Sequence, residues 1–303
     1  MNWFVLSVIA LLCWSGSDLF SKIGCRDGAD KRSHLRMLTA VGAVMGLHCA
    51  YEVFIAGTEL NLQILLTYLP VSALYIASMA IGYLGLRYIE LSISSPICNS
   101  SGALVAILTL ITAGRGEVNE LQLIAVALVI AGVIGLGVIE AREDDTMRAE
   151  RQKSGNFFYS RSVLALIIPV VYCLLDALGT FADSIVLETL DENSANAAYE
   201  LTFFLVGVVC FVWSVCIRKD GYSLKREGPK YIGAVFETAG QFAYIYALSD
   251  SAHVMLAAPI ISAYCAVSVL WGRLFLKEKL SLKHYIAIAL VVAGIVIIGI
   301  FDA

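Results

Sequence analysis

The sequence predicts an all-α integral membrane protein whose ten transmembrane helices form two inverted five-helix repeats. The first supporting observation is composition, because 59% of the 303 residues are hydrophobic and 15% are charged, whereas soluble domains carry about 25% charged residues. The second is the recurrence of apolar runs of about 20 residues, the length that crosses a bilayer as a helix. The third is an internal duplication, since the second half of the chain repeats features of the first.

Ten apolar runs account for most of the chain, and polar or charged residues separate them. Each run is long enough to cross the hydrocarbon core as a helix. The runs lie at residues 2–22, 35–56, 62–86, 91–113, 119–139, 162–188, 198–217, 230–249, 252–275 and 283–301.

Two pairs of segments carry the duplication. Residues 80–96 align without a gap on residues 243–259, and both segments end in a proline. With one residue of slippage, residues 125–137 then align on residues 287–299. Because each copy holds five spans, an odd number, the second copy is expected to cross the membrane upside down. The predicted units are a first repeat at 1–139, a cytoplasmic linker at 140–161 and a second repeat at 162–303.

Positive charge is concentrated on one side of the predicted bundle. Of the 21 Lys and Arg residues, 18 fall in the loops after the first, third, fifth, seventh and ninth runs. Cytoplasmic loops retain positive charge, so this side is expected to face the cytoplasm. Both termini are then extracytoplasmic, and the protein is expected in the cytoplasmic (inner) membrane of the cell. The implied partner is the lipid bilayer, and the net charge of −4 gives no reason to expect nucleic acid.

The sequence predicts neither a metal site nor a cofactor. Seven of the eight cysteines lie within apolar runs, and none has the spacing of a metal site or a disulfide framework. Cysteines of this kind are ordinarily small buried hydrophobic residues.

Carboxylates inside apolar runs are the first candidate site residues. Asp18 and Asp176 lie near the middle of the first and sixth runs, at matching positions of the two repeats. Ionisable groups at membrane depth are costly unless they are paired or face water, and inverted-repeat transporters bind their substrates near the midplane. Both residues are therefore predicted to bind substrate. The alternative for Asp18 is an ion pair with Lys22, which follows it by four residues.

A polar stripe in the eighth run adds three candidates. Glu237, Gln241 and Tyr244 follow one another at intervals of four and three residues, so they share one helix face. Burial favours the protonated form of a carboxyl group, and a nearby cation favours its ionised form. A site that exchanges a proton for a cationic substrate needs a carboxyl group that responds in both ways. Glu237 and Asp176 are predicted to couple protons. The alternative is a carboxylate held by a tyrosine or a backbone group for structural reasons.

Aromatic residues near these carboxylates suit a cationic substrate. Trp14 and Tyr172 each precede an aspartate by four residues, and Tyr75 and Tyr264 lie in the third and ninth runs. Organic ammonium groups are attracted to aromatic faces by cation–π interaction. The alternative is ordinary packing or a place in the interfacial aromatic belts.

The fourth run is unusually polar around its proline. Pro96 removes a helical hydrogen bond there, and Pro259 does the same in the ninth run. Such openings persist only where protein, water or ligand satisfies the backbone. Both prolines are predicted hinges, and Asn99 is predicted to donate hydrogen bonds to a substrate in the cavity.

Further ionisable residues lie in the outer parts of the second, sixth and seventh runs. We expect them at the membrane interface or in a vestibule rather than against the substrate. They are His48, Glu52, Asp183, Glu188 and Glu200.

Three motifs carry a family resemblance. They are WSGSDLFSK in the first run, YALSDSAHVMLAAPIISAYCAVSVLWGRLFLKEKLS from the eighth run onward, and ALVVAGIVIIG near the end. Together they resemble the EamA-type, ten-helix members of the drug/metabolite transporter superfamily, and the resemblance covers nearly the whole chain. It implies a secondary transporter with a central cavity between two five-helix bundles, lined by the first, third, fourth, sixth, eighth and ninth runs. It implies no particular substrate, because members move amino acids, sugars, nucleosides, cationic drugs and choline.

These features predict secondary active transport of a small organic metabolite by alternating access, coupled to protons and favouring cationic or amine substrates. The alternative is an exporter of neutral or zwitterionic metabolites such as amino acids. A lipid-translocating subunit and an intramembrane enzyme remain as other classes, but catalytic motifs such as H-E-x-x-H are missing, so no enzyme is predicted. A small solute and protons are the expected partners. The almost wholly apolar runs 119–139 and 283–301 offer contacts for packing or for a homodimer.

Overall fold

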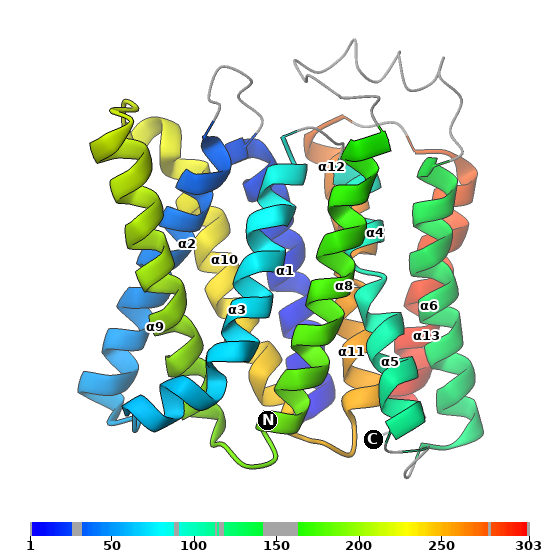
Figure 1. Cartoon of the computed structure of the whole chain (residues 1–303). Coiled ribbons are helices and arrows are strands. Elements are labelled where there is room, and N and C mark those ends of the chain that lie inside the picture. The colour runs from blue at the N-terminus through cyan, green and yellow to red at the C-terminus, as the bar shows by residue number, and fades with distance from the viewer. Residues whose placement is uncertain are drawn as a thin grey trace.

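The computed structural model describes residues 2–25, 32–87, 91–112, 114, 118–141, 163–277 and 280–301. Within these ranges every regular element is a helix, and the helices lie along one another in a single bundle (Figure 1). The predicted all-α fold is confirmed. The elements are α1 (Trp3–Cys25), α2 (Ser33–Tyr51), η1 (Glu52–Ala56), α3 (Leu62–Gly85), α4 (Leu91–Cys98), α5 (Ser101–Thr112), α6 (Glu120–Ala141), α8 (Val163–Val186), α9 (Glu192–Phe211), η2 (Val212–Ile217), α10 (Leu224–Leu248), α11 (Val254–Ser262), α12 (Tyr264–Phe275) and α13 (Leu282–Phe301).

Eight stretches of the described chain are long and apolar enough to cross a membrane. Two of them combine short helices, because α4 with α5 and α11 with α12 each form one stretch. The apolar part of α13 is shorter, Leu282–Ile298, and α10 begins with charged residues that lower its hydropathy. With these two helices added, the ten predicted runs correspond to ten passages through the described bundle.

The two ends of the bundle differ in charge. α1 begins and α13 ends at the same end, which we call the terminal face (Figure 1). The opposite end, which we call the basic face, carries Arg32, Arg87, Arg218 and Lys277 at or near helix ends. The described basic residues therefore gather as the sequence predicts. The side of the membrane that each face meets stays a prediction.

Packed neighbours come from opposite halves of the chain. α1 packs against α10, α3 against α8, α2 against α9 and α6 against α13. Exchanging the two halves turns the first pair into the second and leaves the other two pairs unchanged, as a twofold relation between inverted repeats requires. The division into units at 1–139 and 162–303 stays a prediction, and residues 142–161 of the linker lie outside the described chain.

Glycines allow α6 and α13 to approach closely. A Cβ atom on Gly132 would lie 2.7 Å from the carbonyl oxygen of Ala287, and one on Gly294 would lie 2.6 Å from that of Ala125. Gly132 aligns with Gly294 and Ala125 with Ala287, so the duplicated sequence builds the same contact twice. The homodimer contact predicted for these helices stays a prediction.

Two helices begin earlier than the sequence predicts. α9 begins at Glu192 rather than near residue 198, because the Asp191 side chain accepts a hydrogen bond of 3.0 Å from the Ser194 amide and caps the helix. α10 begins at Leu224 rather than near residue 230. The first turns of both helices are polar, so a search for apolar runs misses them.

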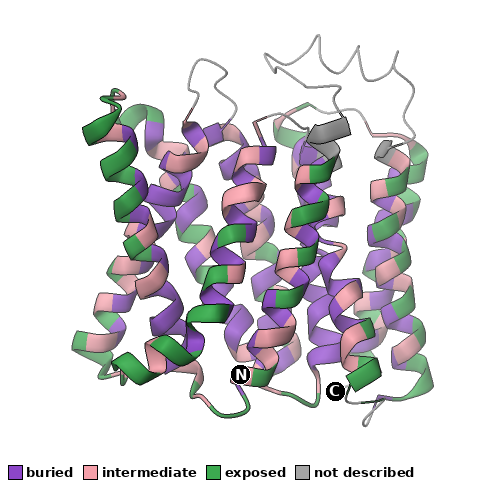
Figure 2. Cartoon of the chain, in the orientation of Figure 1, coloured by how far each residue is buried: buried purple, intermediate pink, exposed green. Residues whose placement is uncertain are grey.

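Burial follows the distribution expected of a protein in lipid. Buried residues face the interior of the bundle, while exposed residues follow the outer sides of the helices (Figure 2). Large hydrophobic side chains such as Leu47, Phe54, Ile111 and Leu282 are exposed. An apolar surface of this extent suits contact with a membrane. The polar side chains that lie inside the bundle are consequently the place to look for function.

Candidate functional site

A cavity of about 930 Å³, its opening included, lies between helices of both halves. Its wall is formed by α1, α3, α4, α5, α8, α9, α10, α11 and α12. The structure brings all ten predicted substrate-binding residues to this wall, although their roles stay predictions. They are Trp14, Asp18, Tyr75, Asn99, Tyr172, Asp176, Glu237, Gln241, Tyr244 and Tyr264.

Hydroxyl groups from two other helices hold Asp18. Its Oδ2 accepts hydrogen bonds from Ser95 Oγ on α4 at 2.6 Å and from Ser268 Oγ on α12 at 2.8 Å. Lys22, the alternative partner considered above, donates from Nζ to the carbonyl oxygen of Leu86 at 2.8 Å. Hydroxyl donors orient a carboxylate without neutralising its charge. Asp18 is thus positioned to attract a cation.

Asp176 and Glu237 are held in the same way across the two halves. Ser101 Oγ on α5 donates to Asp176 Oδ2 at 2.7 Å, and Ser17 Oγ on α1 donates to Glu237 Oε2 at 2.6 Å. Each bond joins a carboxylate of the second half to a serine of the first. The positions of Asp176 and Glu237 therefore depend on how the two halves of the chain pack against each other.

The ionisable side chains of the cavity wall include three carboxyl groups. Among its described lining residues, three are carboxylates and none is lysine, arginine or histidine. Charges interact more strongly inside a bundle than in water because the effective dielectric constant is lower. The described chain contains no group of three or more His, Cys, Asp or Glu side chains arranged to hold a metal ion. Three carboxylates without a basic side chain among them suit a cation or a proton.

Aromatic rings form much of the remaining wall. The Trp14 ring lies 5.0 Å from that of Tyr244 and 5.8 Å from that of Tyr264, between centroids. The Tyr75 ring lies 6.0 Å from Tyr199 and 6.0 Å from Tyr244, with the planes nearly perpendicular. Rings placed beside carboxylates combine electrostatic attraction with cation–π attraction for an ammonium group.

Two glycines make room for the paired aromatic residues. Tyr172 on α8 packs on Gly82 of α3, where a Cβ atom would lie 2.8 Å from the ring. Trp14 on α1 packs on Gly240 of α10, where a Cβ atom would overlap the ring. Each aromatic residue that precedes a cavity aspartate thus lies on a glycine of the other half. Side chains at these positions would push both rings into the cavity.

Both predicted hinge prolines lie one turn before an interruption of a helix. Pro96 is inside α4, which ends at Cys98 before α5 begins at Ser101. Pro259 is inside α11, and the single residue Ala263 separates α11 from α12. The hinge role itself stays a prediction.

Asn99 occupies the interruption between α4 and α5. Its amide nitrogen and its side-chain Nδ2 donate to the carbonyl oxygen of Ser95 at 2.9 and 2.8 Å. A second side-chain bond reaches Ser95 Oγ at 3.3 Å, and that hydroxyl in turn donates to Asp18. Asn99 therefore both closes the end of α4 and orients a donor of Asp18.

Three of the outer ionisable residues, Glu52, Asp183 and Glu200, are buried, so they do not lie at the membrane interface, the first of the two placements expected from the sequence. Asp183 and Glu200 are both 0% exposed. His48 Nδ1 lies 2.8 Å from Glu200 Oε1, and His48 Nε2 lies 3.7 Å from Glu52 Oε1. Neighbouring helices cover the buried side chains. The positions of apolar runs in the sequence do not reveal this packing. Glu188 is exposed just after the end of α8, as expected.

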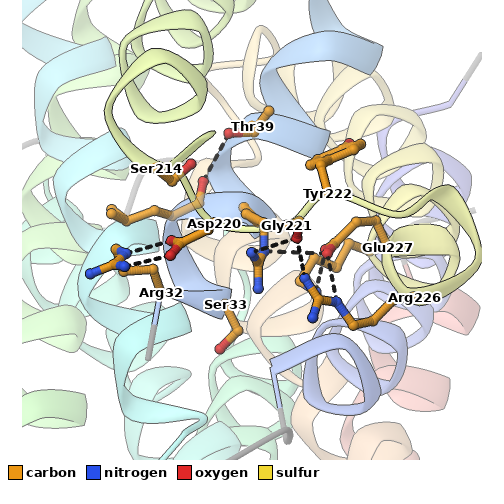
Figure 3. A network of polar contacts seen from close by, with 12 residues as sticks. Arg32, Ser33, Thr39, Ser214, Asp220, Gly221, Tyr222, Arg226 and Glu227 are labelled. Carbon is orange, nitrogen blue, oxygen red and sulfur yellow. Dashed lines mark hydrogen bonds and ion pairs between the residues drawn. The ribbon is translucent and has the colours of Figure 1, made fainter. Parts of the chain in front are cut away.

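Ion pairs join α2 to the start of α10 at the basic face. Glu227 lies 3.3 Å from Arg36 Nε and 2.6 Å from Lys230 Nζ, and all three residues are buried. Arg32 contacts both carboxylate oxygens of Asp220 at 2.5 Å (Figure 3). The Arg32 guanidinium lowers the pKa of Asp220 through this bidentate bond. The five residues do not belong to the described wall of the cavity.

Several residues that line the cavity, and Ser268, which donates to Asp18 without lining the cavity, were not predicted as site residues. Ser17 is adjacent to Asp18 in the chain, and Ser268 follows Tyr264 by four residues, so helical spacing places both near predicted residues. Thr180 follows Asp176 by four residues and carries the same signal. Tyr199 lies in a helix that was not expected to line the cavity, and the sequence offers no comparable signal for it.

Comparison with known proteins finds a family for the second half of the chain. The model of the EamA-like transporter family matches residues 161–300. A solved crystal structure matches with a TM-score of 0.65 and 14% identity, over 99% of this chain and 96% of that one. At this identity the likeness shows the fold alone. No curated protein matches the chain. The comparison confirms the resemblance carried by the motifs: this is a multi-pass membrane protein whose residues 161–300 belong to the EamA-like transporter family, in the drug/metabolite transporter superfamily.

Proposed function

We propose that the protein is a secondary transporter that moves a small organic cation across the cytoplasmic membrane by alternating access, in exchange for protons. The observation that carries this proposal is the cavity, whose described wall combines three carboxylates with aromatic rings and lacks a cationic side chain. An ammonium group bound there would pair with a carboxylate and lie against tyrosine or tryptophan rings. Membership in a transporter family supports transport over catalysis.

Proton exchange follows from competition for the same carboxylates. A proton and a substrate ammonium each neutralise Asp176 or Glu237, and a group that has taken up a proton no longer attracts the ammonium. The serine partners tolerate both states, because a hydroxyl donates to a carboxylate and accepts from a carboxylic acid. Protons arriving from one side would therefore favour release of the cation to that side.

The experiment is flux into liposomes that contain the purified protein and an imposed pH gradient, acidic inside. Radiolabelled choline and tetramethylammonium serve as cationic probes, and glucose serves as the neutral probe. We expect proton-driven uptake of a cation that a protonophore abolishes. Glu237→Gln and Asp176→Asn should each reduce it by at least about tenfold, since one charge-assisted contact is lost, whereas Glu59→Gln in an exposed loop should not. Cation flux that ignores both cavity substitutions would overturn the proton-site assignment.

A zwitterion is the second candidate, and one observation favours it. Within the described chain, Nε2 of the buried Gln241 has no hydrogen-bond partner, and this residue lines the cavity. A substrate carboxylate or carbonyl would satisfy that donor while its ammonium group met Asp18 or Glu237. Uptake of alanine, but not of choline, that falls in Gln241→Leu would favour this candidate over the first.

The orientation is proposed from charge. The basic face would meet the cytoplasm and the terminal face the exterior, because cytoplasmic loops retain Lys and Arg. Epitope tags on the two chain ends, detected in intact cells, test this orientation. Detection of either tag only after permeabilisation would contradict it.

A further inference from the structure

The cavity ends in a ring of hydroxyl groups on the side of the terminal face. On three helices the wall residue nearest that face bears a hydroxyl group: Tyr75 on α3, Thr180 on α8 and Tyr244 on α10. Tyr75 Oη lies 3.2 Å from Thr180 Oγ1, and Tyr75 and Tyr244 are joined through their hydroxyl groups. These contacts join a helix of the first half to two helices of the second. They lie on the terminal-face side of the cavity wall on these three helices.

A buried carboxylate lies directly behind this ring. Asp183 is three residues beyond Thr180 on α8 and is 0% exposed. Its Oδ1 accepts a hydrogen bond of 2.7 Å from Tyr68, and its Oδ2 accepts one of 3.4 Å from Tyr75. Tyr68 is itself 0% exposed. We refer to Tyr68, Tyr75, Thr180, Asp183 and Tyr244 as the Asp183 cluster.

The chemistry of the Asp183 cluster suits a closure that can open. A plug made only of apolar side chains would seal the bundle without the cost of burying a carboxylate. Here both carboxylate oxygens are satisfied by tyrosine hydroxyls, which can exchange partners without leaving a charge unpaired. A cation that reached Asp183 would replace those hydroxyls. The tyrosines could then separate from α8.

Asp183 also follows the cavity aspartate along the same helix face. Asp176 and Asp183 are seven residues apart, which places them about 10 Å apart along the α8 axis and on one side of the helix. A cation leaving Asp176 towards the terminal face would meet Asp183 next. The first carboxylate would hold the cation in the cavity and the second would receive it as the path opens.

We infer that the Asp183 cluster is the gate of the cavity towards the terminal face, and that Asp183 is the cation site exposed when this gate opens. The inference rests on the proposed function, since a gate has meaning only if a solute passes. Asp183 would then contact the substrate only when the gate is open, and would hold the gate closed at other times. It also makes the described conformation the one that is closed at the terminal face.

The test measures access to the cavity without any solute. Cys98 lines the cavity, so a variant that keeps Cys98 and replaces the other seven cysteines with alanine reports on access. A membrane-impermeant cationic methanethiosulfonate is applied to the terminal face in intact cells and to the basic face in inverted vesicles. In this background, Tyr68→Phe and Asp183→Asn should each raise the labelling rate from the terminal face by about tenfold, the effect of losing one hydrogen bond to a charged group.

The control removes a tyrosine hydroxyl outside the cluster. Tyr246 on α10 donates to Asn193 near the terminal face, and both residues belong to the second half. Tyr246→Phe should leave labelling unchanged. Unchanged rates in both cluster variants would overturn the gate, and so would a rise from both faces, which would mean that the cluster only maintains packing. Because the assay uses no gradient or substrate, a shift in labelling together with absent cation flux would reject the organic cation as the solute and Asp183 as its site, but would keep the cluster as the gate for another solute.

Discussion

The two ends of the bundle join the halves of the chain by different chemistry. Near the terminal face, tyrosine hydroxyls and the buried Asp183 connect α3 to α8, directly behind the cavity wall. At the basic face, Glu227 connects α10 to α2 through its ion pair with Arg36 and also pairs with Lys230 of its own helix, away from the wall. The first arrangement closes the cavity, whereas the second fastens two helices. We infer that the ionic contacts stabilise the fold and that the hydroxyl contacts control access.

The largest expected effect lies at the basic face. Glu227→Ala leaves Arg36 and Lys230 without their common carboxylate, and loss of one partner from a buried ion pair costs about 3–5 kcal/mol. The thermal midpoint of the purified protein should fall steeply, while Glu59→Ala, at an exposed position, should leave it unchanged. If Glu227→Ala kept the normal thermal midpoint but changed access to the cavity, the ionic contacts would control access rather than stabilise the fold.

The cavity between the two ends should respond to overpacking. Gly240→Ala places a Cβ atom against the Trp14 ring, and overpacking costs about 1–3 kcal/mol if the neighbour cannot move. Because Trp14 lines the cavity, we expect cation binding to weaken together with stability. Gly228→Ala, where a Cβ atom meets nothing within 4 Å, is the matched control on the same helix. Equal affinities in the two variants would argue against a role for Trp14 in binding.

A smaller loss of stability is expected at the terminal face. Tyr68→Phe removes one hydrogen bond to Asp183, and polar contacts between membrane helices are worth about 1 kcal/mol. The loss should be independent of salt, because the contact is buried and lies away from bulk ions. A decrease as large as that of Glu227→Ala would mean that this end maintains the fold as well.

The smallest effect is expected at the exposed pair of Arg32 and Asp220. Arg32 lowers the pKa of Asp220, so the pair stabilises the folded protein above the ordinary pKa of aspartate. This contribution is lost as the pH falls through the lowered value. Exposed pairs contribute little, so Asp220→Asn should lower the thermal midpoint at pH 7 by about 2 °C or less. The difference should vanish at acidic pH or in 1 M salt, and a difference that persists there would contradict an ionic origin.

Most of the helices could be predicted because lipid imposes a simple pattern. Apolar runs locate the spans, and the prolines at 96 and 259 mark the two interrupted helices. The start of α9 was misplaced because the Asp191 cap and the polar first turn carry no hydropathy signal. The start of α10 was missed for a similar reason, since its first turn is charged.

The site could be predicted in part, for a related reason. Asp18, Asp176 and Glu237 stand out because carboxylates are rare within apolar runs. Serines and glycines are common in such runs, so Ser268 and Gly82 gain their meaning only from the helix that packs against them. The burial of Asp183 likewise depends on α3, which lies more than a hundred residues away in the chain.

The central claim is that the carboxylate cavity binds an organic cation through its charge. The most direct measurement compares choline with 3,3-dimethylbutan-1-ol, its uncharged isostere, by calorimetric titration of the purified protein and of Glu237→Gln. The account predicts that choline binds to the unsubstituted protein at least about tenfold more tightly than the isostere, and that Glu237→Gln removes most of this difference. Equal affinity for the two compounds, or a preference for choline that survives Glu237→Gln, would contradict it.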